Sequence, residues 1–134
     1  MKLYSDESGY EQVRAFDVLI ISCLARVEVP AALWRKHRSG ELSASDARVL
    51  IDAFESDYYG GESRPPRLAV IGLPAFVLDD AARNTVLHGL RAYAAVQLAS
   101  ARSARLSDPE CGTLVCFDQE LRRAALIEGF QLIP

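Results

Sequence analysis

The sequence lacks a long hydrophobic run and is poor in cysteine. No apolar stretch reaches the ~18 residues that a membrane-spanning helix needs, and Met1–Asp6 lacks the apolar segment of a secretory signal peptide. We therefore expect no association with a membrane. Three cysteines cannot all pair within one chain, and Cys23 and Cys116 lie in apolar segments typical of small core residues. This usage predicts a reducing, cytoplasmic location.

A large net charge of either sign is also missing. The chain has 15 Lys and Arg against 18 Asp and Glu, a formal net charge of −3. Nucleic-acid-binding domains are more often basic, but a nuclease is not excluded, because a bound metal ion supplies local positive charge. Internal repeats and low-complexity tracts are absent as well. With 134 residues, of which 50% are hydrophobic and 25% charged, we expect one globular domain over residues 1–134.

Apolar runs and helical periodicity predict alternating strands and helices. The expected strands cover residues 18–21, 67–73, 113–117 and 130–133. The expected helices cover residues 10–16, 23–38, 43–54, 75–87, the stretch from about 90 to 105, and 119–128. Ser22 is the expected N-cap of the second helix, in which Pro30 predicts a kink or a later start. This order is typical of an α/β domain with a parallel sheet covered by helices on both faces.

The periodicity also predicts which side chains point inward. These are Leu24, Val27, Ala31 and Trp34 in the second helix, Val49, Leu50 and Phe54 in the third, Phe76, Val77, Ala81, Thr85 and Val86 in the fourth, and Leu121, Ala124, Ala125 and Ile127 in the last.

The stretch HGLRAYAAVQLASA, residues 88–101, is the most informative pattern in the sequence. It predicts a loop that leads into a buried, alanine-rich helix. The residues that share its inward face at three- and four-residue spacing are Leu90, Tyr93, Ala94, Gln97, Leu98 and Ala101. A helix with this many small side chains can pack closely against another backbone. Taken alone, the pattern is that of a core helix.

Two acidic residues lie where ligands bind in parallel α/β sheets, beyond the carboxyl ends of strands. Asp118 directly follows the expected strand 113–117, and Glu28 lies early in the helix after the first strand. Convergent carboxylates hold Mg²⁺ or Mn²⁺ in metal-assisted phosphodiester hydrolysis. Each residue also has a simpler interpretation, Glu28 as an exposed glutamate and Asp118 as the N-cap of the last helix.

Three segments together resemble the PIN-domain family, in particular the VapC-like ribonuclease toxins of toxin–antitoxin pairs. They are SCLARVEVPAAL (residues 22–33), HGLRAYAAVQLASA (residues 88–101) and LVCFDQEL (residues 114–121), in the family's order. The resemblance implies a PIN-like α/β fold and an endoribonuclease that uses Mg²⁺ or Mn²⁺. It assigns metal-binding and catalytic roles to Glu28 and Asp118. It also implies RNA as substrate, an antitoxin protein as partner, and self-association into a homo-oligomer.

The sequence departs from the family pattern at two of the four acids. Ala94 stands where the family has an aspartate, and Met1-Lys2-Leu3-Tyr4 resembles the end of the segment that begins with the family's first strand and its aspartate. We therefore expect an N-terminally incomplete domain that lacks a central strand. Unpaired backbone groups beside such a gap cost about 1–3 kcal/mol each, so another segment or a partner chain is expected to fill it.

With two acids of four, the chain is expected to have little or no ribonuclease activity. Arg91 and Tyr93 flank position 94 and are candidate RNA contacts, although packing is the simpler interpretation of Tyr93. The alternative function is a degenerate PIN domain that binds protein without catalysis, and a third is an unrelated α/β regulatory domain. His37 and His88 are expected on the surface or in loops, and Asp79-Asp80 as solvated charge.

Overall fold

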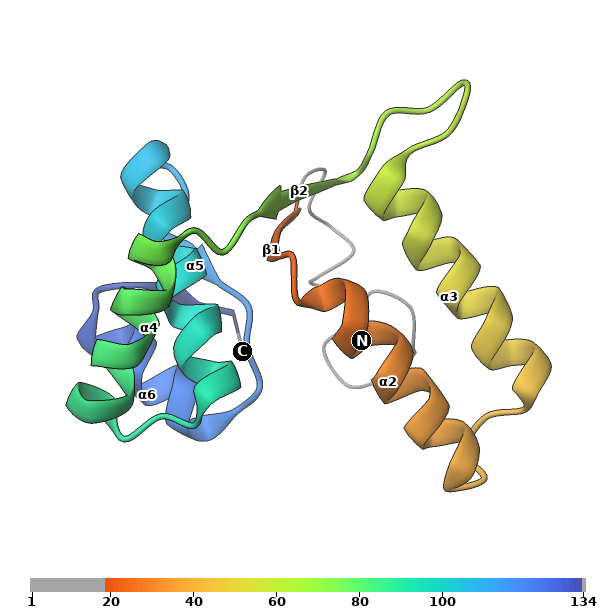
Figure 1. The fold of residues 1–134 in the computed structure, drawn as a ribbon, viewed down its shortest axis with the longest axis horizontal. Coiled ribbons are helices and arrows are strands. Elements are labelled where there is room, and N and C mark those ends of the chain that lie inside the picture. The colour runs from red at the N-terminus through yellow and green to blue at the C-terminus, as the bar shows by residue number, and fades with distance from the viewer. Residues whose placement is uncertain (1–18, 134) are drawn as a thin grey trace. The chain divides into compact units, whose positions relative to one another are not determined.

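The computed structural model describes residues 19–133, which form a mixed α/β structure of short strands and longer helices (Figure 1). The strands are β1 (Leu19–Ser22), β2 (Leu68–Ile71), β3 (Thr113–Leu114) and β4 (Gln131–Leu132). The helices are α2 (Ala25–Arg38), α3 (Ala44–Tyr59), α4 (Ala75–His88), α5 (Ala92–Ser107) and α6 (Gln119–Ile127). The expected α/β class is confirmed at this level. The helix expected over residues 10–16 lies outside the described residues.

The chain divides into two compact units. Unit 1 comprises Met1–Leu19 and Cys23–Val70, and unit 2 comprises Ile20–Ser22 and Ile71–Pro134. Within the described part of unit 1, α2 and α3 pack as a helical hairpin (Figure 1). Unit 2 contains α4, α5, α6 and the β3–β4 pair.

Helix α3 begins and ends at strong local signals. The Ser43 hydroxyl accepts a hydrogen bond from the Asp46 amide at 3.0 Å, the usual N-cap arrangement. The helix continues to Tyr59, five residues beyond the expected end at Phe54, so the sequence-based boundary was wrong. Residues 55–59 contain no glycine or proline, and Gly60, with a φ of +73°, is the first residue that favours a left-handed stop.

Helix α2 begins later than expected. Its N-cap is Leu24, which makes no side-chain cap, so the expected role of Ser22 as N-cap is wrong. Pro30 stays inside the helix, in its second turn. Leu33 is the fully buried side chain of α2, whereas Val27 and Ala31 are exposed. The prediction was therefore wrong for Val27 and Ala31, whereas Leu24 and Trp34 of the same predicted stripe are half-buried. In the described part of unit 1 this helix packs mainly on α3.

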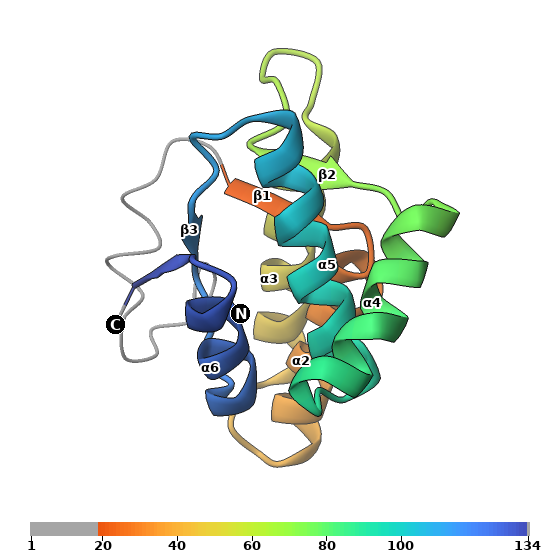
Figure 2. The same cartoon turned by 90° about the vertical axis from the view of Figure 1, so that its left-hand side faces the viewer.

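Unit 2 is built on an antiparallel pair of helices, α4 and α5, that lie side by side (Figures 1 and 2). Gly89, with a φ of +66°, makes the tight connection between them. Helix α6 packs against α5 and is followed by β4. The buried cluster comprises Val77, Ala81, Leu90, Ala94, Ala95, Leu98, Ala99, Cys116, Leu121, Ala124, Ala125 and Phe130. Its many alanines allow close backbone approach, as the sequence of residues 88–101 predicted.

Several apolar residues expected in the core are exposed instead. These are Val49 in α3, Phe76 and Val86 in α4, and Ile127 in α6. Each helix buries one stripe, and in α4 that stripe is Val77, Ala81 and Asn84. Phe76 and Val86 lie outside this stripe and are exposed. A helix with apolar residues on two faces gives no sequence signal for which face is buried.

Within residues 19–133, the strands form two two-stranded sheets, β1 with β2 and β3 with β4. β3 and β4 are parallel, with Thr113 opposite Gln131 and Leu114 opposite Leu132, which agrees with the expected parallel pairing. β2, β3 and β4 are shorter than the apolar runs that predicted them. No helix in residues 19–133 combines the length and apolar character needed to cross a membrane.

Candidate functional site

Asp118 lies at the N-cap of α6. Its Oδ1 accepts a hydrogen bond from the Leu121 amide at 2.8 Å, so the simpler structural role of Asp118 is observed. Nearby, the Arg122 guanidinium donates to the carbonyl oxygens of Cys116 and Ile133 at 2.9 and 2.8 Å. These bonds fix the segment after β3 relative to the segment after β4. Asp118 therefore has a well-defined position at the surface of unit 2.

Position 94 lies in the first turn of α5, three residues after the N-cap Arg91. Ala94 is buried in the core of unit 2. The Arg91 guanidinium is largely exposed and lies 4.0 Å from the Glu120 carboxylate in the first turn of α6. The N-terminal turns of α5 and α6 are therefore neighbours. Unit 2 places position 94 and Asp118 on these two adjacent helix ends.

Glu28 belongs to unit 1 and lies in the first turn of α2, where a negative charge interacts favourably with the helix dipole. It is half-buried, not an ordinary exposed glutamate. Tyr93 is half-buried in α5, with its backbone in the turn that contains Ala94. The sequence segments that suggested a site therefore belong to different units, with Glu28 in one and residues 91–94 and Asp118 in the other.

The described residues do not by themselves form a site for a divalent metal ion. Among residues 19–133, no three His, Cys, Asp or Glu side chains gather closely enough to hold one. Ala94 has no ligating atom, and one oxygen of Asp118 is engaged by the Leu121 amide. Mg²⁺ and Mn²⁺ prefer several oxygen ligands. No catalytic step through a metal is therefore assigned to this chain.

Cysteine chemistry also offers no ligand set within the described chain. Burial raises the pKa of the Cys116 thiol; the Arg122 guanidinium opposes this change and Asp118 adds to it. Desolvation and Asp108 raise the pKa of Cys111 as well. Both thiols therefore favour the protonated form, which binds metal and attacks electrophiles poorly. Cys116 is a core residue, as its apolar segment predicted.

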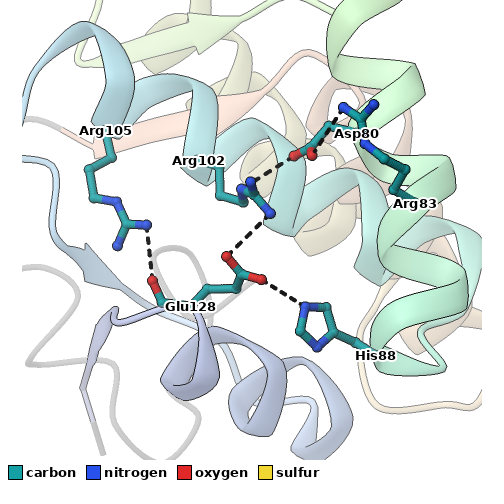
Figure 3. Close-up of polar contacts among 6 residues, drawn as sticks. All are labelled: Asp80, Arg83, His88, Arg102, Arg105 and Glu128. Carbon is teal, nitrogen blue, oxygen red and sulfur yellow. Dashed lines mark hydrogen bonds and ion pairs between the residues drawn. The ribbon is translucent and has the colours of Figure 1, made fainter.

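A polar network that the sequence did not reveal joins the three helices of unit 2 (Figure 3). Arg102 of α5 lies 3.4 Å from Asp80 of α4 and 3.2 Å from Glu128 at the end of α6. Glu128 also contacts His88 Nε2 at 2.9 Å. The side chains of His88, Asp80 and Glu128 are only 8%, 18% and 21% exposed. The expectations of a surface His88 and a solvated Asp80 were therefore wrong, because both side chains are largely buried against charged partners on other helices.

Two further residues complete this network. Arg83 lies 3.6 Å from Asp80, and Arg105 donates to the backbone oxygen of Glu128 at 3.0 Å while its guanidinium stacks over Phe130. The Asp80–Arg83 spacing of three residues was a local signal for one pair. The contacts across helices span 22 to 40 residues of sequence and had no such signal. These contacts join α4, α5 and the end of α6, and we call the network of Asp80, Arg83, His88, Arg102, Arg105 and Glu128 the clamp.

Comparison with known proteins adds no family assignment, since no family model matches the chain and no curated protein matches it at the required similarity.

Proposed function

We propose that this chain is a ribonuclease scaffold of the PIN type, like the toxins of toxin–antitoxin pairs, with catalysis weak or absent in its present form. The ordered resemblance of residues 22–33, 88–101 and 114–121 supports the scaffold. The observation that carries the loss of activity is Ala94, a buried methyl group in the first turn of α5. Ala94 lies near the N-terminal end of α6, where Asp118 is the N-cap. The resemblance requires a carboxylate at position 94.

The proposal gives each remaining residue a limited role. Glu28 and Asp118 are the acids left from a set that would hold Mg²⁺ or Mn²⁺ against an RNA phosphate. Arg91, exposed at the start of α5, supplies a guanidinium suited to a phosphate oxygen. RNA, an antitoxin protein and a second copy of the chain are the proposed partners, in a reducing cytoplasm.

A second candidate function is a protein-binding module without catalysis. Exposed apolar side chains favour it, since α4 presents Phe76, Val86 and Leu87 and α6 presents Leu126 and Ile127. Single exposed apolar residues are ordinary, but several on one helix are typical of surfaces that bind other proteins.

Thermal melts with and without Mn²⁺ separate the two candidates. The chain as given is compared with Ala94→Asp and with Ala92→Asp, a control that adds the same carboxylate at an exposed position of the same helical turn. A ligand that binds the folded state at 100 times its Kd stabilises that state by about 2.7 kcal/mol. The scaffold proposal predicts a Mn²⁺-dependent rise in Tm for Ala94→Asp and none for Ala92→Asp or the parent chain.

Asp118→Asn in the Ala94→Asp background should abolish that rise, because an amide caps the helix but ligates metal weakly. If folded Ala94→Asp shows no more Mn²⁺ stabilisation than Ala92→Asp, position 94 is not the site of a lost ligand. The protein-binding module then becomes the better account.

A further inference from the structure

The segment that leads into α6 exposes an aromatic side chain. Cys116 is buried in unit 2, whereas the next residue, Phe117, is 42% exposed. The three residues that follow, Asp118, Gln119 and Glu120, are polar and also exposed. Phe117 therefore begins a polar exposed stretch, unlike the apolar side chains that lie together on the outer face of α4.

The usual structural role of an apolar residue at this position does not account for Phe117. It directly precedes the N-cap Asp118, where an apolar side chain usually packs against an apolar residue at the fourth position of the helix. The fourth residue of α6 is Arg122, and its guanidinium donates to the carbonyl oxygens of Cys116 and Ile133. The pair of apolar side chains that fixes many helix starts is therefore not formed here.

We propose that Phe117 stacks on an unpaired nucleobase and thereby determines which part of an RNA strand reaches this surface. The proposal rests on the ribonuclease scaffold and names a residue that selects its substrate. Every nucleobase has a flat π face, and an exposed aromatic side chain binds that face with little regard to sequence. In a duplex the neighbouring bases cover both faces of each base, so Phe117 selects bases that are unpaired.

The surroundings of Phe117 suit a base that is joined to a phosphate. The N-terminal turns of α5 and α6 are neighbours, and the Arg91 side chain, 87% exposed, carries donors for a phosphate oxygen. Gln119 is exposed two residues after Phe117, and its amide suits the polar edge of a base. The Asp118 carboxylate disfavours a phosphate directly beside Phe117, so the uncharged base is expected there and the phosphate nearer Arg91.

Fluorescence anisotropy with the full chain and a labelled, mixed-sequence oligoribonucleotide in EDTA tests the stacking without cleavage. The parent should bind the single strand about tenfold or more tightly than the same RNA in a duplex. Phe117→Ala and Phe117→Leu should each raise the dissociation constant about tenfold, because both lose the π face although leucine stays apolar. Phe117→Tyr should bind as the parent does. Phe76→Ala, which removes an exposed aromatic side chain from α4, is the matched control and should change nothing.

Tryptophan emission reports the stacking directly. In Phe117→Trp, a base stacked on the indole should quench the added emission, whereas the emission of Trp34 in the parent, in unit 1, should not change. RNA should bind at least as tightly as DNA of the same sequence, and tighter binding of DNA would remove RNA as the ligand.

Three other results would overturn the proposal. They are a folded Phe117→Ala that binds the single strand as the parent does, a duplex bound as tightly as the single strand, and a parent chain that binds no RNA. Circular dichroism melts establish that each variant is folded. The first two results leave the ribonuclease scaffold standing. That scaffold fails separately, if Ala94→Asp gains no stabilisation from Mn²⁺.

Discussion

Removal of Arg102 should destabilise unit 2 because this residue forms ion pairs with both Asp80 and Glu128. In Arg102→Met the side chain keeps most of its apolar stem, so the main loss is the guanidinium and its contacts at 3.4 and 3.2 Å. Among the ion pairs within residues 19–133, Asp80 then retains that with Arg83 at 3.6 Å, and Glu128 retains that with His88.

The magnitude follows from the burial of the two carboxylates. Exposed ion pairs contribute about 0–1 kcal/mol, whereas removal of one partner of a buried pair costs about 3–5 kcal/mol. Asp80 and Glu128 are about one-fifth exposed and both keep a second partner. An intermediate loss of about 2 kcal/mol in the free energy of unfolding is expected.

Urea unfolding followed by circular dichroism measures this loss, and amide hydrogen exchange in α4–α6 locates it in unit 2. Arg123→Met, an exposed position on α6, is the matched control and should change stability by less than about 0.5 kcal/mol. A double-mutant cycle with Asp80→Asn should give a coupling energy near 1 kcal/mol. If Arg102→Met is as stable as the control, the clamp has no energetic role and the reasoning is wrong.

Three further substitutions test local features. Asp118→Ala should lose about 1 kcal/mol through the N-cap of α6, while Asp118→Asn keeps the cap and the melting temperature; equal losses for both would contradict this. Gly60→Ala should destabilise by about 2 kcal/mol or more, since its Cβ would meet the Arg64 oxygen at 2.8 Å, whereas Gly40→Ala, also at positive φ but in open space, should cost about 1 kcal/mol. A thermal melt with the reverse order would refute that account. Asn84→Leu should raise stability by about 1 kcal/mol, because both amide atoms of this fully buried residue have no hydrogen-bond partner in the structure; a large loss in urea unfolding would show that the amide is satisfied.

Much of the local structure could be predicted because its causes are local. Ser43 and Asp118 mark the starts of α3 and α6 through hydrogen bonds within three residues. The alanine-rich helix and the parallel direction of β3 and β4 followed from composition and the order of elements.

The features that failed depend on partners distant in sequence. In α4, the face with Phe76 and Val86 and the face with Val77 and Ala81 are both apolar. The sequence could not show which of the two is buried without knowledge of where α5 packs. His88 was expected at the surface because its partner Glu128 is 40 residues away. The roles of Glu28 and Asp118 as ligands rest on the resemblance and stay predictions.

Cleavage of a mixed RNA substrate in Mg²⁺ or Mn²⁺ is the most direct test of the proposed function. The chain as given is compared with a version that carries Ala94→Asp and an upstream apolar strand ending in aspartate. The proposal predicts that only the restored version cuts, and that Asp118→Asn or Glu28→Gln silences it. If both versions fold and neither cuts, the chain is not a disabled ribonuclease.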